Sequence, residues 1–349
     1  MKKNLAIIFG GCSSEYPVSL KSAYSILTNI DSSKYDVIPV GITRDGQWFH
    51  FYGNYQEILD DTWHQNLLQL KPAFLSPDRS VHGLGEITDK GLRFFWIDAV
   101  FPVLHGKNGE DGSLQGLAEL AGIPVIGCGV LASALSMDKH RAHQIVKLAG
   151  VKVPRAVHFD RKPSESALLN SCKELTYPLF VKPLRAGSSL GITKIARPDQ
   201  LAEAAEAAFS HDSQILIEEN VEGFEVGCAV LGNENLLLGR VDEVELDTWF
   251  FDYEEKYTQQ HAKIHMPARI DSSTEKRIQE AAVTIYRALD CKGFARVDMF
   301  LTPSGEIVFN EVNTIPGCTT LSRYPKMLSG IGMSYADVVE SLIQSELPS

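Results

Sequence analysis

The segment that most restricts the fold is residues 296 to 313, RVDMFLTPSGEIVFNEVN, in which a turn-forming Pro-Ser-Gly separates two apolar runs. Each run is typical of a β-strand, so the segment predicts an antiparallel hairpin. A two- or four-residue turn sets Asp298 opposite Glu311. The same register sets Arg296 opposite Asn313. Because side chains alternate along a strand, we expect these four on one face of a sheet.

The chemistry of this face suits a cation and a developing oxyanion. Two carboxylates and an amide oxygen, from Asp298, Glu311 and Asn313, are ligands for a hard cation such as magnesium, with phosphate oxygens completing the shell. The neighbouring Arg296 suits negative charge that develops on a reacting carbonyl. The alternative is a solvated hairpin face with alternating ion pairs. The Asn-Thr-x-Pro-Gly turn after the second strand favours the site.

A second distinctive stretch is PLFVKPLRAGSSLGITK, residues 178 to 194. Its glycines let backbone N–H groups point inward, and Ser188 and Ser189 add hydroxyl donors, so the loop suits an anion such as phosphate. Lys182 and Lys194 add positive charge at its two ends. The loop has no Gly-Lys-Ser/Thr ending and opens no helix, so a nucleotide site here would be a strand-loop-strand lid. An ordinary surface hairpin is the alternative.

The whole chain limits the class of protein. With 349 residues we expect two or three lobes, and no apolar run approaches the length of a transmembrane helix. The six cysteines contain no Cys-x-x-Cys pair, which is typical of a reducing compartment such as the cytoplasm. A net charge of -11 argues against nucleic-acid binding. We therefore expect a soluble, cytoplasmic small-molecule enzyme with neither a nucleic-acid nor a membrane partner.

Hydrophobic patterns divide the chain into three lobes. We expect an N-terminal lobe over 1–135, an open and mostly parallel α/β sheet, with Ser113 as a helix N-cap and 50–97 as an elaborated insertion. A central lobe over 136–225 carries the phosphate loop. The C-terminal lobe over 226–349 is predicted to be α+β and largely antiparallel. It contains one clear helix, over 273–290, and a long loop, over 247–266, that is typical of a lid.

Two loops of the N-terminal lobe, SSEYPVS and HGKNGEDGSLQG, follow strands at the sheet edge where α/β proteins bind ligands. Glu15 suits an ammonium group, and the helix N-termini suit a carboxylate or a phosphate. An amino acid would satisfy both. The alternative is that Glu15 only lies near a helix start and His105 is a loop histidine. Three acidic residues near the predicted lobe junction suit adenine and ribose or, equally, a solvated strand end: Glu218, Glu219 and Glu225.

Taken together, the lysine-flanked loop and the acidic hairpin resemble the ATP-grasp ligases. Seven stretches resemble, in order, the motifs of D-alanine–D-alanine ligase: GGCSSEYPVSL, HGKNGEDGSLQG, DKHRAH, VKPLRAGSSLGITK, FDYEEKY, GFARVDMF and NEVNTIPGCTTLSRYP. They span Gly10 to Pro325. The resemblance implies a three-lobed ATP-grasp fold, α/β and α+β, with an N-terminal open α/β domain, and it implies a homodimer.

The resemblance also implies roles for individual residues. It assigns Glu15 and His105 to the first D-alanine, and Arg296 and the Gly317 N–H to the tetrahedral intermediate. It assigns to ATP Lys139, Lys182, Glu218, Glu219, Glu225 and, at the phosphates, Lys256. It joins Ser188 to Glu15 and Tyr257 in a hydrogen-bond chain, and leaves Lys194 structural. It assigns to magnesium or manganese, as two expected ions, Asp298, Glu311 and Asn313.

The departures from the family pattern bear on the second substrate. Arg323 stands where ligases that make D-alanyl-D-alanine usually carry an aliphatic residue, and a guanidinium offers donors to a hydroxyl or a carboxylate. The position resembles the D-alanine–D-serine ligases of vancomycin resistance, with Ser322 and Asp242 as further pocket candidates. Arg323 paired to a carboxylate at the surface is the alternative. Pro17 replaces a commonly acidic residue, which leaves the support of Glu15 open.

The sequence therefore predicts ATP-dependent ligation of D-alanine to D-serine through a D-alanyl phosphate. A D-alanine–D-alanine ligase of ordinary cell-wall synthesis is the runner-up. A D-lactate-forming relative is expected to carry histidine where this chain has Tyr257. A nucleotide-binding regulatory protein without turnover is a third possibility.

Overall fold

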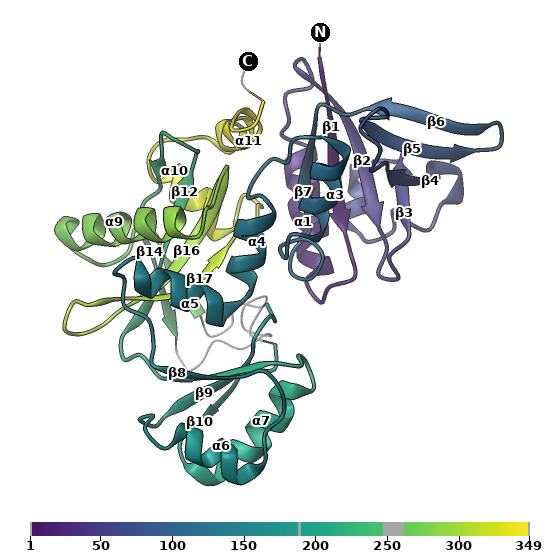
Figure 1. The fold of residues 1–349 in the computed structure, drawn as a ribbon. Coiled ribbons are helices and arrows are strands. Elements are labelled where there is room, and N and C mark those ends of the chain that lie inside the picture. The colour runs from purple at the N-terminus through teal and green to yellow at the C-terminus, as the bar shows by residue number, and fades with distance from the viewer. Residues whose placement is uncertain (1, 188–189, 247–261, 348–349) are drawn as a thin grey trace.

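The computed structural model describes residues 2–187, 190–246 and 262–347, and these form three sheets, each with its own helices (Figure 1). The N-terminal lobe, purple to blue, lies beside the C-terminal lobe, and the central lobe lies below. Within the described part of the chain, no helix is long and apolar enough to cross a membrane.

The N-terminal sheet has the strand order β6-β5-β4-β3-β2-β1-β7. Its strands are β1 (Lys3–Gly10), β2 (Tyr35–Ile42), β3 (Trp48–Phe51), β4 (Leu70–Leu75), β5 (Gly83–Thr88), β6 (Gly91–Trp96) and β7 (Ala99–Val103). Its helices are α1 (Tyr16–Leu27), α2 (Tyr55–Leu59), α3 (Ser113–Ala121) and a short 3-10 turn, η1 (Leu67–Gln69). The next helix, α4 (Val130–Met137), packs instead on the C-terminal lobe, whose core includes Ala132.

Two predictions for this lobe were wrong. Only the β1–β2 and β1–β7 pairs are parallel, whereas β2 to β6 pair in antiparallel fashion, so the sheet is not mostly parallel. The predicted insertion supplies most of these antiparallel strands and widens the sheet. Ser113 is the first residue of α3 rather than its cap, because Gly112 takes the N-cap position with a φ of 91° that favours glycine.

The central lobe has the strand order β10-β9-β11-β8. Its strands are β8 (Ala156–Phe159), β9 (Leu179–Pro183), β10 (Thr193–Ile195) and β11 (Ile215–Glu219), and its helices are α6 (Glu165–Cys172), the 3-10 turn η2 (Pro198–Gln200) and α7 (Leu201–Phe209). The helix α5 (Lys139–Leu148) precedes it. The predicted phosphate loop joins the antiparallel strands β9 and β10, as a strand-loop-strand unit requires.

The C-terminal sheet has the order β15-β14-β12-β16-β17, with β13 paired to β12. Its strands are β12 (Phe224–Leu231), β13 (Leu237–Leu238), β14 (Asp242–Leu246), β15 (Ala262–His265), β16 (Phe294–Leu301) and β17 (Ile307–Asn313), and its helices are α9 (Ser272–Ala288), α10 (Arg323–Ser329) and α11 (Tyr335–Gln344). The strand pairs of this sheet, within the described residues, are antiparallel, as predicted. The predicted lid ends in a strand, β15, and its residues 247–261 lie outside the described ranges.

The largest apolar core joins the first and third lobes. Phe9 and Phe101 of the N-terminal sheet are buried in one cluster with Tyr324 of α10 and Leu342 of α11. The rings of Phe101 and Phe294 lie 6.2 Å apart in an edge-to-face arrangement. This packing brings the chain after β17 against α1, where the predicted substrate residues lie.

Candidate active site

The hairpin of β16 and β17 has the predicted register. Arg296 pairs with Asn313 and Asp298 pairs with Glu311, and the register shifts by a bulge directly after Asp298. The Arg296 guanidinium donates to the Asp298 carboxylate at 2.8 and 2.7 Å, and Asn313 Nδ2 donates to it at 2.8 Å. The four side chains therefore gather as predicted, with the buried carboxylate of Asp298 at their centre.

Arg323, the first residue of α10, extends this cluster. Its guanidinium donates to Asp242 at 2.7 and 2.8 Å and to Glu225 at 2.7 Å, and it lies 3.4 Å from Asp298. Burial alone would lower the pKa of Arg323, but the three carboxylates raise that pKa well above its usual range. Arg323 is thus ion-paired, yet in the interior rather than at the surface.

The central lobe brings two of the predicted ATP residues together. Lys182 of β9 and Glu218 of β11 are diagonal neighbours on one face of the sheet and form a buried ion pair. Lys139, at the start of α5, donates from Nζ to the Ala186 carbonyl of the phosphate loop at 2.8 Å. The same Nζ is 4.0 Å from Glu311 of the C-terminal lobe. These lysines therefore border the space between the two sheets.

The structure does not bring the Glu219 carboxylate to this group. Glu219 follows Glu218 on β11, so its side chain points to the opposite face. It accepts from Arg155 Nη1 at 3.1 Å and from the Thr176 N–H at 2.8 Å. Lys194 Nζ lies 5.3 Å from the centre of the Phe180 ring, a cation–π contact in keeping with its predicted structural role.

Glu15 reaches the phosphate loop from the N-terminal lobe. A Cβ atom added to Gly187 would lie 2.7 Å from Glu15 Oε2, and one added to Gly106 would lie 2.6 Å from it. The carboxylate therefore lies against two backbones that only glycine allows so close. Ser188 comes directly after Gly187, but Ser188, Lys256 and Tyr257 lie outside the described ranges.

Tyr16, which follows Glu15, is held in place by two side chains. The Tyr16 hydroxyl donates to Asp61 at 2.9 Å and accepts from Trp63 Nε1 at 3.0 Å. Pro17 occupies the first turn of α1, where a backbone N–H would have no acceptor within the helix, so proline is tolerated there. The start of α1 is thus anchored by a buried aromatic pair instead of an acidic side chain.

His105 has protein partners at both ring nitrogens. Nδ1 donates to the Ile315 carbonyl at 2.7 Å, and Nε2 is 3.3 Å from Ser22 Oγ. Burial lowers the pKa of His105, so the neutral ring is favoured. Ser322, the N-cap of α10, places its hydroxyl 3.2 Å from the position of a Cβ on Gly317. His105 therefore holds neighbouring segments of the predicted first-substrate site together through both of its ring nitrogens.

Glu110 and Ser22, which hold the loops around Gly317, were not predicted from the sequence. Glu110 accepts from the backbone N–H groups of Gly106 and Ile315. Ser22 accepts from the Cys318 N–H at 3.1 Å. The only signal was that Glu110 stands inside the stretch HGKNGEDGSLQG, which follows a strand.

The predicted cation ligands are oxygen donors from two facing strands. Among the residues described, no group of three or more His, Cys, Asp or Glu side chains could hold a metal ion. The predicted ligand set is not a group of that kind, because it combines only two carboxylates, those of Asp298 and Glu311, with the amide of Asn313. Such oxygens suit magnesium or manganese. The donor chemistry therefore fits a divalent cation held together with phosphate oxygens.

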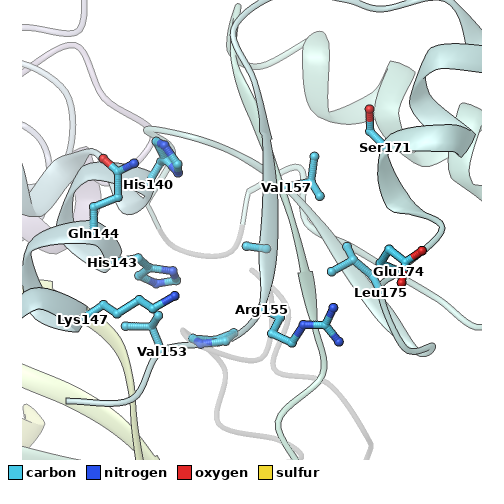
Figure 2. Close-up of a pocket in the computed structure, with 12 residues that line it drawn as sticks. His140, His143, Gln144, Lys147, Val153, Arg155, Val157, Ser171, Glu174 and Leu175 are labelled. Atoms are coloured by element: carbon cyan, nitrogen blue, oxygen red, sulfur yellow. The ribbon is translucent and has the colours of Figure 1, made fainter. Parts of the chain in front are cut away.

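A cavity of about 390 Å³ lies away from this site (Figure 2). Figure 2 shows His140, His143 and Lys147 of α5 on one side of it and Glu174 on the other. None of the predicted site residues lines it. The cavity is therefore separate from the candidate active site.

The comparisons with known proteins agree with this geometry. Residues 4–128 match the family model "D-ala D-ala ligase N-terminus", and residues 145–344 match "D-ala D-ala ligase C-terminus". The chain is 44% identical to the vancomycin B-type resistance protein VanB of Enterococcus faecalis, covering 98% of each chain. It is 41% identical to a D-alanine–D-alanine ligase of Caldicellulosiruptor bescii, covering 98% of this chain and 94% of the relative.

Among solved structures, the VanG D-Ala:D-Ser ligase of Enterococcus faecalis superposes with a TM-score of 0.93, at 58% identity and 99% coverage of both chains. A D-alanine–D-alanine ligase from Coxiella burnetii superposes with a TM-score of 0.84, at 28% identity and with 98% of this chain and 93% of that one covered.

The chain therefore belongs to the D-alanine–D-alanine ligase family. It has the ATP-grasp fold and is an ATP-dependent ligase. Its substrates are ATP and D-alanine. It joins the D-alanine to a second D-configured acid, in ordinary cell-wall synthesis or in vancomycin resistance. A divalent cation accompanies ATP in this family.

Proposed function

We propose that this protein ligates D-alanine to D-serine, and that its product gives altered peptidoglycan precursors in vancomycin resistance. The observation that carries the proposal is the partly buried guanidinium of Arg323, fixed between Asp242 and Glu225 beside the acidic hairpin. A polar anchor of this kind suits a second substrate that bears a hydroxyl. The VanG D-Ala:D-Ser ligase, the solved relative described above, supports the choice of serine.

In the proposed reaction, the carboxylate of D-alanine first takes the γ-phosphoryl group of ATP. No enzyme nucleophile is needed, since catalysis of phosphoryl transfer rests on positioning and charge. Lys139 and Lys182 border the space between the sheets and orient the phosphates. Glu15, which touches the phosphate loop, holds the ammonium group of D-alanine.

The amine of D-serine then attacks the acyl phosphate. Arg296 and the Gly317 N–H stabilise the tetrahedral oxyanion, and phosphate leaves. Within the described chain, no group accepts a hydrogen bond from the Gly317 N–H, so this donor is available to the oxyanion. The divalent cation, when bound by Asp298, Glu311 and Asn313, supplies charge that balances the phosphates. The product is D-alanyl-D-serine.

The test is a competition at near-neutral pH with ATP, magnesium, D-alanine and an equal concentration of D-serine, both dipeptides being quantified by mass. We expect D-alanyl-D-serine to dominate. Dominant D-alanyl-D-alanine would replace the proposal by ordinary cell-wall synthesis, the role that the name of the Caldicellulosiruptor bescii relative favours. If neither dipeptide formed and no ADP appeared, the protein would be a nucleotide-binding regulator.

A further inference from the structure

The turn that carries Gly317 is fastened to the N-terminal lobe through Ile315. The Ile315 carbonyl accepts from His105 Nδ1 at 2.7 Å, and the Ile315 N–H donates to Glu110 Oε1 at 3.0 Å. Both bonds join segments more than 200 residues apart in the sequence, with separations of 210 and 205. One peptide unit on each side of Ile315 is thereby fixed by the other lobe.

The far side of Gly317 is fastened as well. The Cys318 N–H donates to Ser22 Oγ at 3.1 Å, and Ser22 Oγ lies 3.3 Å from His105 Nε2. Because the His105 Nδ1 proton serves the Ile315 carbonyl, Nε2 is the acceptor and the Ser22 hydroxyl donates to it. The Cys318 N–H therefore donates to Ser22, Ser22 donates to His105, and His105 donates to the Ile315 carbonyl. This series holds the residues on both sides of Gly317.

Glu110 joins the two loops that face each other here. Its Oε2 accepts from the Gly106 N–H at 2.7 Å, while its Oε1 accepts from Ile315. Burial and the nearby Glu15 charge raise the pKa of Glu110 to about 8, and the two N–H donors oppose this rise. An ionisable group in such a site lowers the stability of the fold. Its presence there therefore favours a specific role over simple packing.

We propose that Glu110 is a positioning residue that holds the Gly317 N–H in place for the oxyanion formed when the second amino acid attacks. The proposal rests on the proposed function, since it requires Gly317 to act on the tetrahedral intermediate. Glu110 acts through the 315–318 turn and touches no reacting atom. Glu110 also holds Gly106, against which Glu15 lies, so phosphorylation of D-alanine should slow slightly, whereas the amine attack, which needs the Gly317 N–H, should slow much more.

The two steps can be measured separately in a rapid-quench experiment with ATP, D-alanine and D-serine at about pH 9, where Glu110, with its pKa of about 8, is ionised. ADP formation reports the phosphoryl transfer, and dipeptide formation reports the amine attack. For Glu110→Gln, whose amide accepts only one of the two bonds, we expect dipeptide formation about tenfold slower with ADP formation within about threefold of normal. For Glu110→Ala we expect about a hundredfold loss in the second step, the size typical of a misplaced group.

Glu119→Gln is the matched control, because Glu119 is an exposed glutamate on the neighbouring helix α3. It should leave both steps unchanged. Thermal melting checks that each variant folds, and Glu110→Gln keeps the side-chain shape if Glu110→Ala does not fold. Equal slowing of both steps, or of neither, would overturn the role of Glu110 while leaving the proposed function intact. Absence of any dipeptide from the unaltered protein would instead overturn the proposed function itself.

Discussion

At the scale of single residues, the proposed selection of the second substrate depends on Arg323. Its guanidinium is held in a fixed orientation by the bidentate contact with Asp242. Asp242 is fully buried and also accepts from the Gly227 N–H at 3.0 Å. A planar group fixed in this way presents its donors in one direction, which favours a substrate with a matching acceptor.

Replacement of Arg323 by leucine should move the product ratio from D-alanyl-D-serine toward D-alanyl-D-alanine. We expect a shift of about tenfold, the effect of losing roughly one hydrogen bond to a charged group. The measurement is the mass ratio of the two dipeptides from equal concentrations of D-alanine and D-serine. An unchanged ratio in a folded variant would exclude Arg323 from the selection of substrate.

This variant needs a stability control. Leucine at 323 leaves the Asp242 charge buried without its partner, a change that typically costs about 3–5 kcal/mol. The double variant Arg323→Leu with Asp242→Asn removes that charge and should melt at a higher temperature than the single variant. A ratio shift common to both variants would assign the effect to the lost guanidinium rather than to partial unfolding.

At the scale of elements, α5 shows how a helix cap places a ligand-binding residue. Its N-cap Asp138 accepts from the Arg141 N–H at 2.9 Å, directly before Lys139. Asp138→Ala removes the cap, which should cost about 1 kcal/mol and let the first turn fray. We expect the KM for ATP to rise about threefold to tenfold, because Lys139 loses its fixed approach to the phosphate loop.

Asp138→Asn is the conservative comparison, since asparagine caps helices as well as aspartate does. It should keep the KM for ATP near that of the unaltered protein. Initial rates at varied ATP concentration decide between the two outcomes. A similar KM for the Ala and Asn variants would show that the cap does not position Lys139.

The elements also show which parts of the structure could be predicted from the sequence. The register of Asp298 and Glu311 in the β16–β17 hairpin was predicted, because alternation and a short turn fix it locally, but the bulge after Asp298 was not. The strand β5 was missed, since its sequence GLGEIT contains two glycines, a poor strand former. The glycine at 85 is there because the Phe74 ring occupies the place of its side chain, a contact that no local pattern reveals.

The same distinction holds for the site. Residues that act through short-range geometry, such as Asp298, were predicted from spacing, and the motifs placed Lys139 and Lys182 by resemblance. Glu110 was missed because its role depends on a contact between two lobes. The opposite orientations of Glu218 and Glu219 follow from strand alternation, which requires the exact strand position to be known.

At the scale of the whole molecule, the first and third lobes form one packed unit. The core shared by the N-terminal sheet with α10 and α11 fixes the Gly317 turn relative to Glu15. The central lobe has its own small core, around Leu179 and Ile217. A polar contact, the hydrogen bond from Lys139 to the Ala186 carbonyl, joins it to the site. The Gly317 turn and Glu15 therefore belong to one packed unit, whereas the phosphate loop belongs to a separately packed lobe.

Buried histidines should make this assembly sensitive to mild acid. Burial lowers the pKa of His50, His105, His143 and the half-buried His140 below the usual value. A lowered pKa means that the unfolded chain takes up protons first, so stability is present above about pH 6.5 and is lost as the pH falls. Each such histidine contributes at most about 1.4 kcal/mol per pH unit. Glu110 opposes this trend, because its raised pKa gives stability that is lost as the pH rises toward about 8.

Burial raises the pKa of Glu346 as well as that of Glu110, but four histidines outweigh these two glutamates, so the melting temperature should fall between pH 7.5 and pH 5.5. Calorimetry at both pH values measures the change. His50→Gln should reduce the fall, because His50 is buried against Glu86 at 3.0 Å in the N-terminal sheet. His64→Gln, at an exposed position, is the matched comparison. A melting temperature that stays level or rises on acidification would mean that the buried carboxylates, and not the histidines, dominate the proton balance of folding.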